Sequence, residues 1–305
     1  MQRTLDSAIE LTGKGLHSGA AAYLRLMPAP ANHGIWLRRV DVFHTDNMIP
    51  ARWDRVNDTQ LCTRLSNDAG VEVSTVEHLM AALAGCGVHN ALIEIDGPEV
   101  PIMDGSSDPF VAAILRAGLA EQDAPIRAIR ILRDVTVTVD GVSATLSPSD
   151  TVEIGFVIDF DEPAIGKQQK TLQMSNGAFV RELSDCRTFC RRRDVDMMRS
   201  VGLALGGGLE NAIVVEGSAV LNPEGFRRAD ECVRHKMLDA LGDLALAGAP
   251  ILGAYHGEKA GHRTTNMLLR ALFAAPDAYQ VIDCSAAQAD TLPGAHISPK
   301  DFARL

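Results

Sequence analysis

The sequence predicts an α+β protein built as two domains, each combining strands with helices. Three observations support this prediction. The chain has 305 residues, more than one hydrophobic core commonly contains. Strand patterns and helical patterns follow one another in both halves. A polar segment without helical pattern, at 121–125, separates the halves, so we expect domains at 1–122 and 123–305.

The first half begins with short strand patterns and turns and continues into a helix at 74–85. Apolar residues recur there at helical spacing, namely Val76, Leu79, Met80 and Leu83. Residues 90–95 then predict a buried strand, which Gly97 and Pro98 end. Residues 109–117 predict a second amphipathic helix. This mixture makes the first domain α+β.

The second half repeats the mixture. Val135, Val137 and Val139 alternate with polar residues, and Asp140-Gly141 supplies a hairpin turn. Further elements are expected as a strand at 153–160, a short helix at 178–183 and a long helix at 230–247 that ends at Gly248. The apolar stretch 244–255 is too short and too rich in Gly and Pro to span a bilayer, so it is expected in the core.

Composition limits the classes of function. The net charge of -10 argues against a nucleic-acid-binding protein, which normally carries a basic face. Asp6 and Glu10 interrupt the N-terminal segment, which therefore lacks a signal-peptide core, and no segment suits a transmembrane helix. We expect a cytoplasmic protein. The six cysteines form no CxxC pair, so free thiols are expected.

The predicted helix at 230–247 carries the clearest chemical pattern. His235, Asp239 and Asp243 follow one another every four residues, which places them on one stripe, about 40° apart in succession. Apolar residues occupy roughly the opposite side, namely Val233, Met237 and Leu244. An imidazole and a carboxylate one turn apart can bind one cation. The same spacing also occurs in pairs that form only an exposed hydrogen bond, so this helix alone does not decide the function.

The first predicted helix adds a carboxylate and an imidazole. His78 lies away from the apolar stripe, next to Glu77, while Ser74 and Glu77 match a capping box in which Ser74 is the N-cap. A catalytic zinc site needs three protein ligands and a nearby carboxylate, and this chain could supply both from Glu77, His78, His235 and Asp239. A second carboxylate and imidazole, Asp243 and His262, could form an acid or electrostatic pair.

Two glycine-rich stretches and one basic run predict no ligand site by themselves. Residues 13–19 miss the spacing of a dinucleotide fingerprint, and residues 205–209 lack the ending of a phosphate loop. Both predict turns. The run Arg191-Arg192-Arg193 is typical of a solvated face and gives a modest indication of anion contact.

Taken together, motifs along nearly the whole chain resemble the UDP-3-O-acyl-N-acetylglucosamine deacetylases, the LpxC family. The motifs are Gly15-Leu16-His17-Ser18-Gly19, Asp58-Thr59, Leu61-Cys62-Thr63, Thr75-Val76-Glu77-His78-Leu79, residues 81–85, Pro101-Ile102-Met103-Asp104-Gly105-Ser106, Arg187-Thr188-Phe189, the run 233–239 and Gly261-His262. The resemblance implies two similar domains, each a layered helix-on-sheet sandwich, with the active site at their interface.

The resemblance also implies a reaction, namely zinc-dependent hydrolysis of the N-acetyl group of UDP-3-O-acyl-N-acetylglucosamine. This reaction releases acetate and is the committed step of lipid A biosynthesis. By the resemblance, His78, His235 and Asp239 hold zinc (Zn²⁺) and Glu77 is the general base on the metal-bound water, which overrides the capping interpretation. Fe²⁺ also suits these ligands and could be the ion in the cell.

The remaining roles follow from the same resemblance. His262, oriented by Asp243, acts as acid or electrostatic stabiliser, and Thr188 donates to the oxyanion. The substrate contacts implied are Lys236, Phe189, Phe160 on the uracil, Lys259 near the diphosphate, and Cys62. The partner is a small-molecule UDP-sugar bearing an acyl chain, and a monomer is expected.

The clearest departure from the family lies after Phe189. The family commonly continues with Gly and an aromatic residue, whereas this chain has Cys190 and the arginine run. The departure falls in a second-domain insert around 190–215 that lines the acyl passage in the family, and Leu209 likewise replaces a frequent aromatic.

Two alternatives stay open: a metal hydrolase of another acylated amine, and a non-enzymatic binding module in which Glu77 is only a helix cap.

Overall fold

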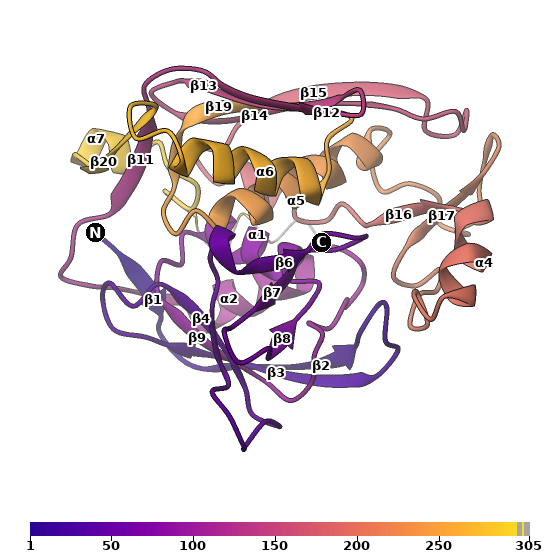
Figure 1. Cartoon of the computed structure of the whole chain (residues 1–305), viewed down its shortest axis with the longest axis horizontal. Helices are drawn as coiled ribbons and strands as arrows, with labels where there is room; N and C mark the ends of the chain where they lie inside the picture. Colours follow the sequence, from indigo (N-terminus) through magenta and orange to yellow (C-terminus); the bar gives the residue numbers. More distant parts are fainter. Residues whose placement is uncertain (298–300, 302–305) are drawn as a thin grey trace.

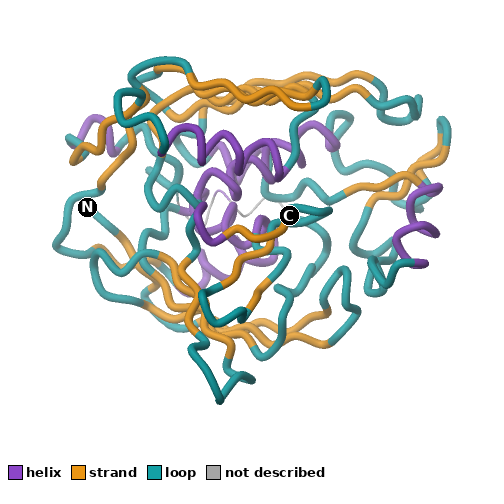
Figure 2. Tube along the Cα trace, viewed as in Figure 1, coloured by secondary structure: helices purple, strands orange, loops and turns teal. Residues whose placement is uncertain are grey.

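The computed structural model describes residues 1–297 and 301, and it consists of layers. Figure 1 shows one β-sheet on each outer side and helices between them, namely α1 (Glu77–Cys86), α2 (Asp108–Ala117), α5 (Glu231–Ala245) and α6 (His262–Phe273). The same arrangement of strands and helices is visible along the chain trace (Figure 2). Helices α1 and α5 pack against each other in the centre. The α+β prediction is confirmed.

The first outer sheet is built from residues 9–95. Its strand order is β2-β3-β9-β4-β5, with β2 (Ile9–Lys14), β3 (Ala21–Pro28), β9 (Ala91–Ile95), β4 (Ile35–Arg39) and β5 (Met48–Pro50). Buried residues alternate with more exposed ones along β3 and β9. This alternation directs one apolar face of the sheet toward the helices, as expected for a sheet covered on one side.

The second outer sheet is built from residues 127–283. Its main path is β12-β13-β19-β11-β20, with β12 (Val135–Val139), β13 (Val142–Pro148), β19 (Ile251–Glu258), β11 (Arg127–Ile131) and β20 (Tyr279–Asp283). Strand β14 (Val152–Asp159) also pairs with β19, and β15 (Lys167–Gln173) pairs with β14. The predicted hairpin turn joins β12 to β13, where Asp140 and Gly141 both have positive φ.

Smaller elements complete the fold. They are β1 (Arg3–Leu5) with β10 (Leu119–Glu121), β6 (Val56–Asp58) with β7 (Arg64–Ser66) and β8 (Glu72–Val73), η1 (Trp53–Arg55), α3 (Ala178–Glu182) and α7 (Ala286–Ala289). Strand β10 ends at the expected domain boundary, although the division into domains at 122 remains a prediction. Among the described residues, no helix combines the length and apolar character that crossing a bilayer requires.

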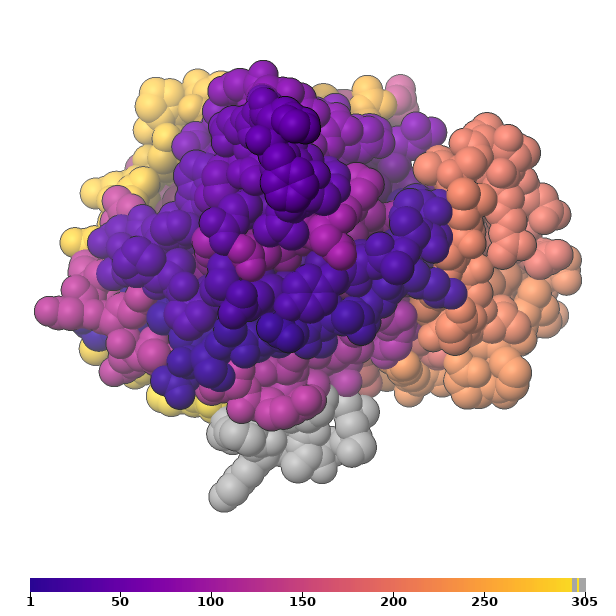
Figure 3. Space-filling model, turned by 90° about the horizontal axis from the view of Figure 1, so that it is seen from below, coloured from indigo at the N-terminus to yellow at the C-terminus, as the bar shows by residue number. Residues whose placement is uncertain are grey.

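Residues 189–220 form a lobe of their own, which we call the 189–220 lobe. It contains β16 (Phe189–Arg191), α4 (Arg192–Ser200), β17 (Ile213–Glu216) and β18 (Ala219–Val220). The space-filling view shows it beside the N-terminal residues (Figure 3). Backbone amides of Leu205 and Gly206 donate to the carbonyls of His17 and Leu16, at 3.1 and 3.0 Å. The two glycine-rich turns thus contact each other.

One local prediction is wrong. Helix α1 begins at Glu77, its N-cap is Val76, and no side chain caps it. The Ser74 hydroxyl donates instead to the carbonyl of Pro98 at 3.1 Å. Since Thr75 has φ of 58°, the chain turns between Ser74 and the helix, and the capping box cannot form. The six cysteines are free thiols, as expected.

Candidate active site

Helices α1 and α5 approach closely enough to bring residues distant in sequence together. Gly242 on α5 lies against the backbone of Glu77, so that a Cβ atom at position 242 would be 2.0 Å from the Glu77 carbonyl oxygen. Glycine therefore permits this helix contact where any side chain would prevent it. The contact places His78, the second residue of α1, beside the His235 and Asp239 pair on α5.

These three residues form a buried cluster with the chemistry of a metal site. One ligand atom from each of His78, His235 and Asp239 lies within 4.8 Å of the others. The two Nε2 atoms lie 3.6 Å (His78) and 3.3 Å (His235) from Asp239 Oδ1. Among the described residues, no hydrogen-bond donor reaches that buried oxygen. An unpaired buried carboxylate oxygen is costly, so this site fits a cation.

The environment of His235 favours the form that binds metal. Its Nδ1 lies 3.0 Å from the carbonyl oxygen of Cys186, to which it can donate, leaving the lone pair of Nε2 facing the cluster. Burial lowers the pKa of His235 to about 4, so the imidazole is neutral near pH 7. Lys236 Nζ donates to Asp239 Oδ2 at 2.7 Å and so leaves Oδ1 to the cluster.

A second buried group lies next to the cluster. His262 Nδ1 lies 2.8 Å from Asp243 Oδ2, and its Nε2 lies 3.5 Å from Glu77 Oε1. Burial alone would lower the pKa of His262, but the Asp243 and Glu77 carboxylates raise it to about 9. Burial raises the pKa of Glu77. The pair therefore combines an imidazolium with a carboxylate that is a stronger base than usual.

Thr63 connects the two halves of this second group, a role not expected from the sequence, although the residue belongs to the Leu61-Cys62-Thr63 motif. Its backbone amide donates to Glu77 Oε2 at 3.1 Å, and its hydroxyl donates to Asp243 Oδ1 at 2.6 Å. Its side chain is buried. Thr63, which precedes α1 in the sequence, thus holds one carboxylate on α1 and another on α5. No periodicity or spacing reveals such a bridge, because its partners are 14 and 180 residues away.

A cavity of about 670 Å³ opens onto both groups. Predicted site residues that line it are Glu77, His78, Thr188, Phe189, Phe160, His235, Lys236, Asp239 and His262. The rings of Phe160 and Phe189 meet edge to face at 5.4 Å. The 189–220 lobe adds apolar side chains that the sequence did not single out, among them Met197, Met198, Val201 and Leu203. The cavity therefore has a polar region at the His78, His235 and Asp239 cluster and an apolar region at the 189–220 lobe.

Three predicted site residues lie outside the cavity lining. Asp243 is buried behind His262. Cys62 is also buried, and burial followed by the negative charge of Glu77 raises the pKa of its thiol to about 12. Lys259 is exposed, donates to Asp159 at 2.9 Å and adjoins Ala260, which does line the cavity. Substrate contact by Cys62 and Lys259 stays a prediction.

The fold and the site define a class of protein. A buried His-His-Asp cluster beside a basic carboxylate and an imidazolium, open to a cavity, is the arrangement of metal-dependent hydrolases. No covalent nucleophile is needed for such chemistry. The geometry alone leaves the bond that is hydrolysed unspecified.

Comparison with known proteins specifies the family. The model of the UDP-3-O-acyl N-acetylglycosamine deacetylase (LpxC) family matches residues 2–274. Three proteins named UDP-3-O-acyl-N-acetylglucosamine deacetylase illustrate the similarity. That of Phenylobacterium zucineum is 50% identical over 280 residues, covering 92% of this chain and 96% of the relative. That of Stenotrophomonas maltophilia is 49% identical over 282 residues, covering 92% of each. That of Shewanella oneidensis is 46% identical over 299 residues, covering 96% and 97%.

This chain belongs to the UDP-3-O-acyl N-acetylglycosamine deacetylase family. It is accordingly an enzyme, a hydrolase that acts on an amide.

Proposed function

We propose that this enzyme hydrolyses the N-acetyl group of UDP-3-O-acyl-N-acetylglucosamine, as the committed step of lipid A biosynthesis. The amide C–N bond breaks, a C–O bond forms with water, and the products are acetate and a free amine. The observation that carries the proposal is the buried cluster of His78, His235 and Asp239 beside Glu77 and His262. The names of the relatives supply the substrate.

We propose His78, His235 and Asp239 as the ligands of one divalent metal ion. Two imidazoles and one carboxylate suit zinc, and they suit Fe(II) as well. The unpaired Asp239 oxygen and the neutral His235 support this assignment. A bound ion would polarise the amide carbonyl and lower the pKa of the attacking water toward about 7.

Glu77 is the general base in this proposal. The backbone amide of Thr63 donates to Glu77 Oε2, while Glu77 Oε1 faces His262 and the cavity. Glu77 accepts a proton from the attacking water as the water oxygen bonds to the carbonyl carbon. The raised pKa of Glu77 makes it a stronger base than an exposed glutamate.

His262 and Thr188 act on the other atoms of the amide. With a pKa near 9, His262 is protonated at neutral pH and can give its Nε2 proton to the leaving nitrogen. Asp243 holds the ring by its Nδ1 and stabilises its charge. The Thr188 hydroxyl, on the cavity wall, donates to the carbonyl oxygen as negative charge develops there.

Substrate binding is proposed for the rest of the cavity. The apolar side chains of the 189–220 lobe suit an acyl chain, and Phe160 and Phe189 offer aromatic surfaces to the nucleotide and sugar. Lys236, Lys259 and Cys62 are further proposed contacts. We also propose that the enzyme acts as a monomer in the cytoplasm.

The test is acetate release from UDP-3-O-acyl-N-acetylglucosamine by the purified protein. Release should stop after chelation and return with about one equivalent of zinc, because the described residues contain one such cluster. The same assay with Fe(II) compares the two ions. Failure to release acetate with metal bound would refute the proposed substrate. Activity that survives complete metal removal would refute the proposed chemistry.

A further inference from the structure

A second cavity, which we call the rear cavity, lies on the other side of the two central helices. It has a volume of about 520 Å³, and its lining contains none of the residues assigned to the active site. On α1 it is lined by Met80, Leu83 and Ala84. Since each helical residue advances by about 100°, these three residues lie on the face of α1 opposite His78.

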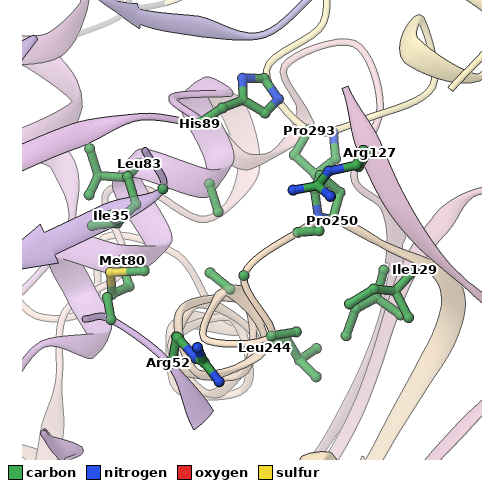
Figure 4. A pocket seen from close by; sticks show the side chains of 18 of the residues that line it. Ile35, Arg52, Met80, Leu83, His89, Arg127, Ile129, Leu244, Pro250 and Pro293 are labelled. Atoms are coloured by element: carbon green, nitrogen blue, oxygen red, sulfur yellow. The ribbon is translucent and has the colours of Figure 1, made fainter. Parts of the chain in front are cut away.

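Helix α5 is divided in the same way. Leu241, Leu244 and Ala245 line the rear cavity, whereas His235 and Asp239 lie on the opposite face of α5. Strand residues of both outer sheets complete the lining, with Ile35 and Trp36 from the first and Ile129 from the second. In Figure 4, Met80 and Leu83 border one side of the hollow, Ile129 borders the other, and Leu244 lies between them. The body of the cavity is thus apolar.

Two charged groups of the lining, Arg127 and Glu153, lie on the second sheet. Arg127 precedes Ile129 on β11 by two residues, and Ile129 pairs with Ile251 of β19. Glu153 pairs with Ala254, three residues further along β19. At about 3.3 Å per residue, the backbones of Arg127 and Glu153 are therefore separated by roughly 16 Å along the sheet. Arg127 and Glu153 are therefore well separated within the lining.

Arg127 is the cation available to a ligand. It is exposed, and no ion pair of its guanidinium is seen among the described residues, although Asp283 of β20 is its cross-strand partner. Among the other basic groups of the lining, Arg52 is bonded to Asp54 through two nitrogens, and His33 Nδ1 lies 3.1 Å from the carbonyl oxygen of Gly34. The pKa of His89 falls to about 4 through burial, so this ring is neutral. Figure 4 shows Arg127 beside Pro293 and Pro250 at the edge of the hollow.

We propose that the rear cavity binds an unbranched aliphatic carboxylate, with the carboxylate at Arg127 and the chain between α1 and α5. The volume falls within the range of about 300–1,000 Å³ typical of small-molecule sites, whose lining is likewise mostly apolar with few polar groups. An aliphatic chain gains free energy by leaving water, and the guanidinium orients the head group. This proposal does not depend on the reaction proposed above.

The positions of the tryptophans make the proposal testable. The chain has two, and Trp36 lines the rear cavity, while Trp53 stacks on Phe273, another lining residue, at 4.8 Å. Neither tryptophan lines the catalytic cavity. Dodecanoate titrated into the full-length protein should therefore change tryptophan fluorescence saturably, at one equivalent per chain. Dodecylamine, with the opposite charge, should bind more weakly.

Matched variants separate the two cavities. Arg127→Gln should weaken dodecanoate binding about twofold to fivefold, the range expected for one exposed ion pair. Arg133→Gln, which removes an exposed arginine outside the rear cavity, should leave it unchanged. Ala245→Phe should fill the cavity and abolish the fluorescence change, and Ala84→Leu serves the same purpose if that variant fails to fold.

Three results would overturn the proposal. Dodecanoate that inhibits the enzyme competitively without changing tryptophan fluorescence would be bound in the catalytic cavity. Equal affinity of the Arg127→Gln and Arg133→Gln variants for dodecanoate would show that Arg127 does not bind the carboxylate, and would refute the assigned ligand class. Unchanged binding by the folded Ala245→Phe and Ala84→Leu variants would place the ligand elsewhere.

Discussion

Replacing Gly242 by alanine tests whether the contact between α1 and α5 sets the geometry of the active site. The added Cβ would lie 2.0 Å from the carbonyl oxygen of Glu77, a backbone atom that cannot rotate away. An acceptable contact is at least about 3 Å, so the helices must separate locally by about 1 Å. His78 is attached to one helix and His235 to the other, so the separation acts directly on the metal cluster.

The expected effect on stability is small, and the effect on activity is large. Overpacking costs about 1–3 kcal/mol, whereas alanine is favoured over glycine within a helix by about 1 kcal/mol. The free energy of unfolding should therefore fall by no more than about 2 kcal/mol. A misplacement of about 1 Å at reacting groups can reduce turnover about 100-fold. The variant should remain folded and lose most of its activity.

The assay combines thermal unfolding, metal content and kcat for acetate release. Gly97→Ala is the matched control, because no atom lies within 4 Å of its added Cβ and its φ is not positive. It should retain the stability and turnover of the original protein. A Gly242→Ala variant with metal content and kcat within about threefold of that control would refute the reasoning, because the helix contact would then not determine the site.

Glu77→Gln should abolish acetate release while the protein still binds metal, and His235→Ala should lose both, which metal analysis of the two variants checks; a metal-free Glu77→Gln protein would contradict the assigned roles. Thr63→Val removes the 2.6 Å hydrogen bond to Asp243. An unsatisfied buried oxygen costs about 1–3 kcal/mol, so kcat should fall about tenfold or more. Thr63→Ser should restore it, and a valine variant with unchanged kcat would refute the bridge. In the metal-free protein, the pKa of His262 near 9 exceeds its ordinary value near 6.5. The charged ring therefore contributes its full stability below about pH 6.5, and this contribution is lost as the pH rises through 9. Denaturant titrations across this range should show the loss, and Asp243→Asn should reduce it; an equal loss in that variant would contradict the assignment.

Local pattern located the elements that carry the site, within a few residues. The helical spacing at 74–85 corresponds to α1, and the expected helix at 230–247 corresponds to α5. The strand at 90–95 is β9. These helices form where the apolar spacing predicts them because the apolar side chains on one face of a helix must pack against a core, whatever residues that core contains. No helix was expected at the position of α6, although its sequence is also amphipathic.

The capping-box pattern predicted the wrong contact because tertiary partners compete with local ones. The Ser74–Glu77 pattern matches a capping box, yet Glu77 accepts its hydrogen bond from Thr63 and faces His262. The apolar stretch 244–255 was expected in the core, and its large apolar side chains are indeed buried, namely Leu244, Leu246, Ile251, Leu252 and Tyr255. It is divided between the end of α5, a turn and β19, the strand that joins much of the second sheet.

The sequence by itself determined the residue types of the site and, through its motifs, the family. His235 and Asp239 face the same way because a helix repeats about every 3.6 residues, and this holds before any tertiary contact forms. Only the tertiary structure decided that His78 joins them, since Gly242 must first let α1 approach α5. It also decided which carboxylates Thr63 connects, because contacts between distant segments depend on how the whole chain packs and leave no periodic trace in the sequence.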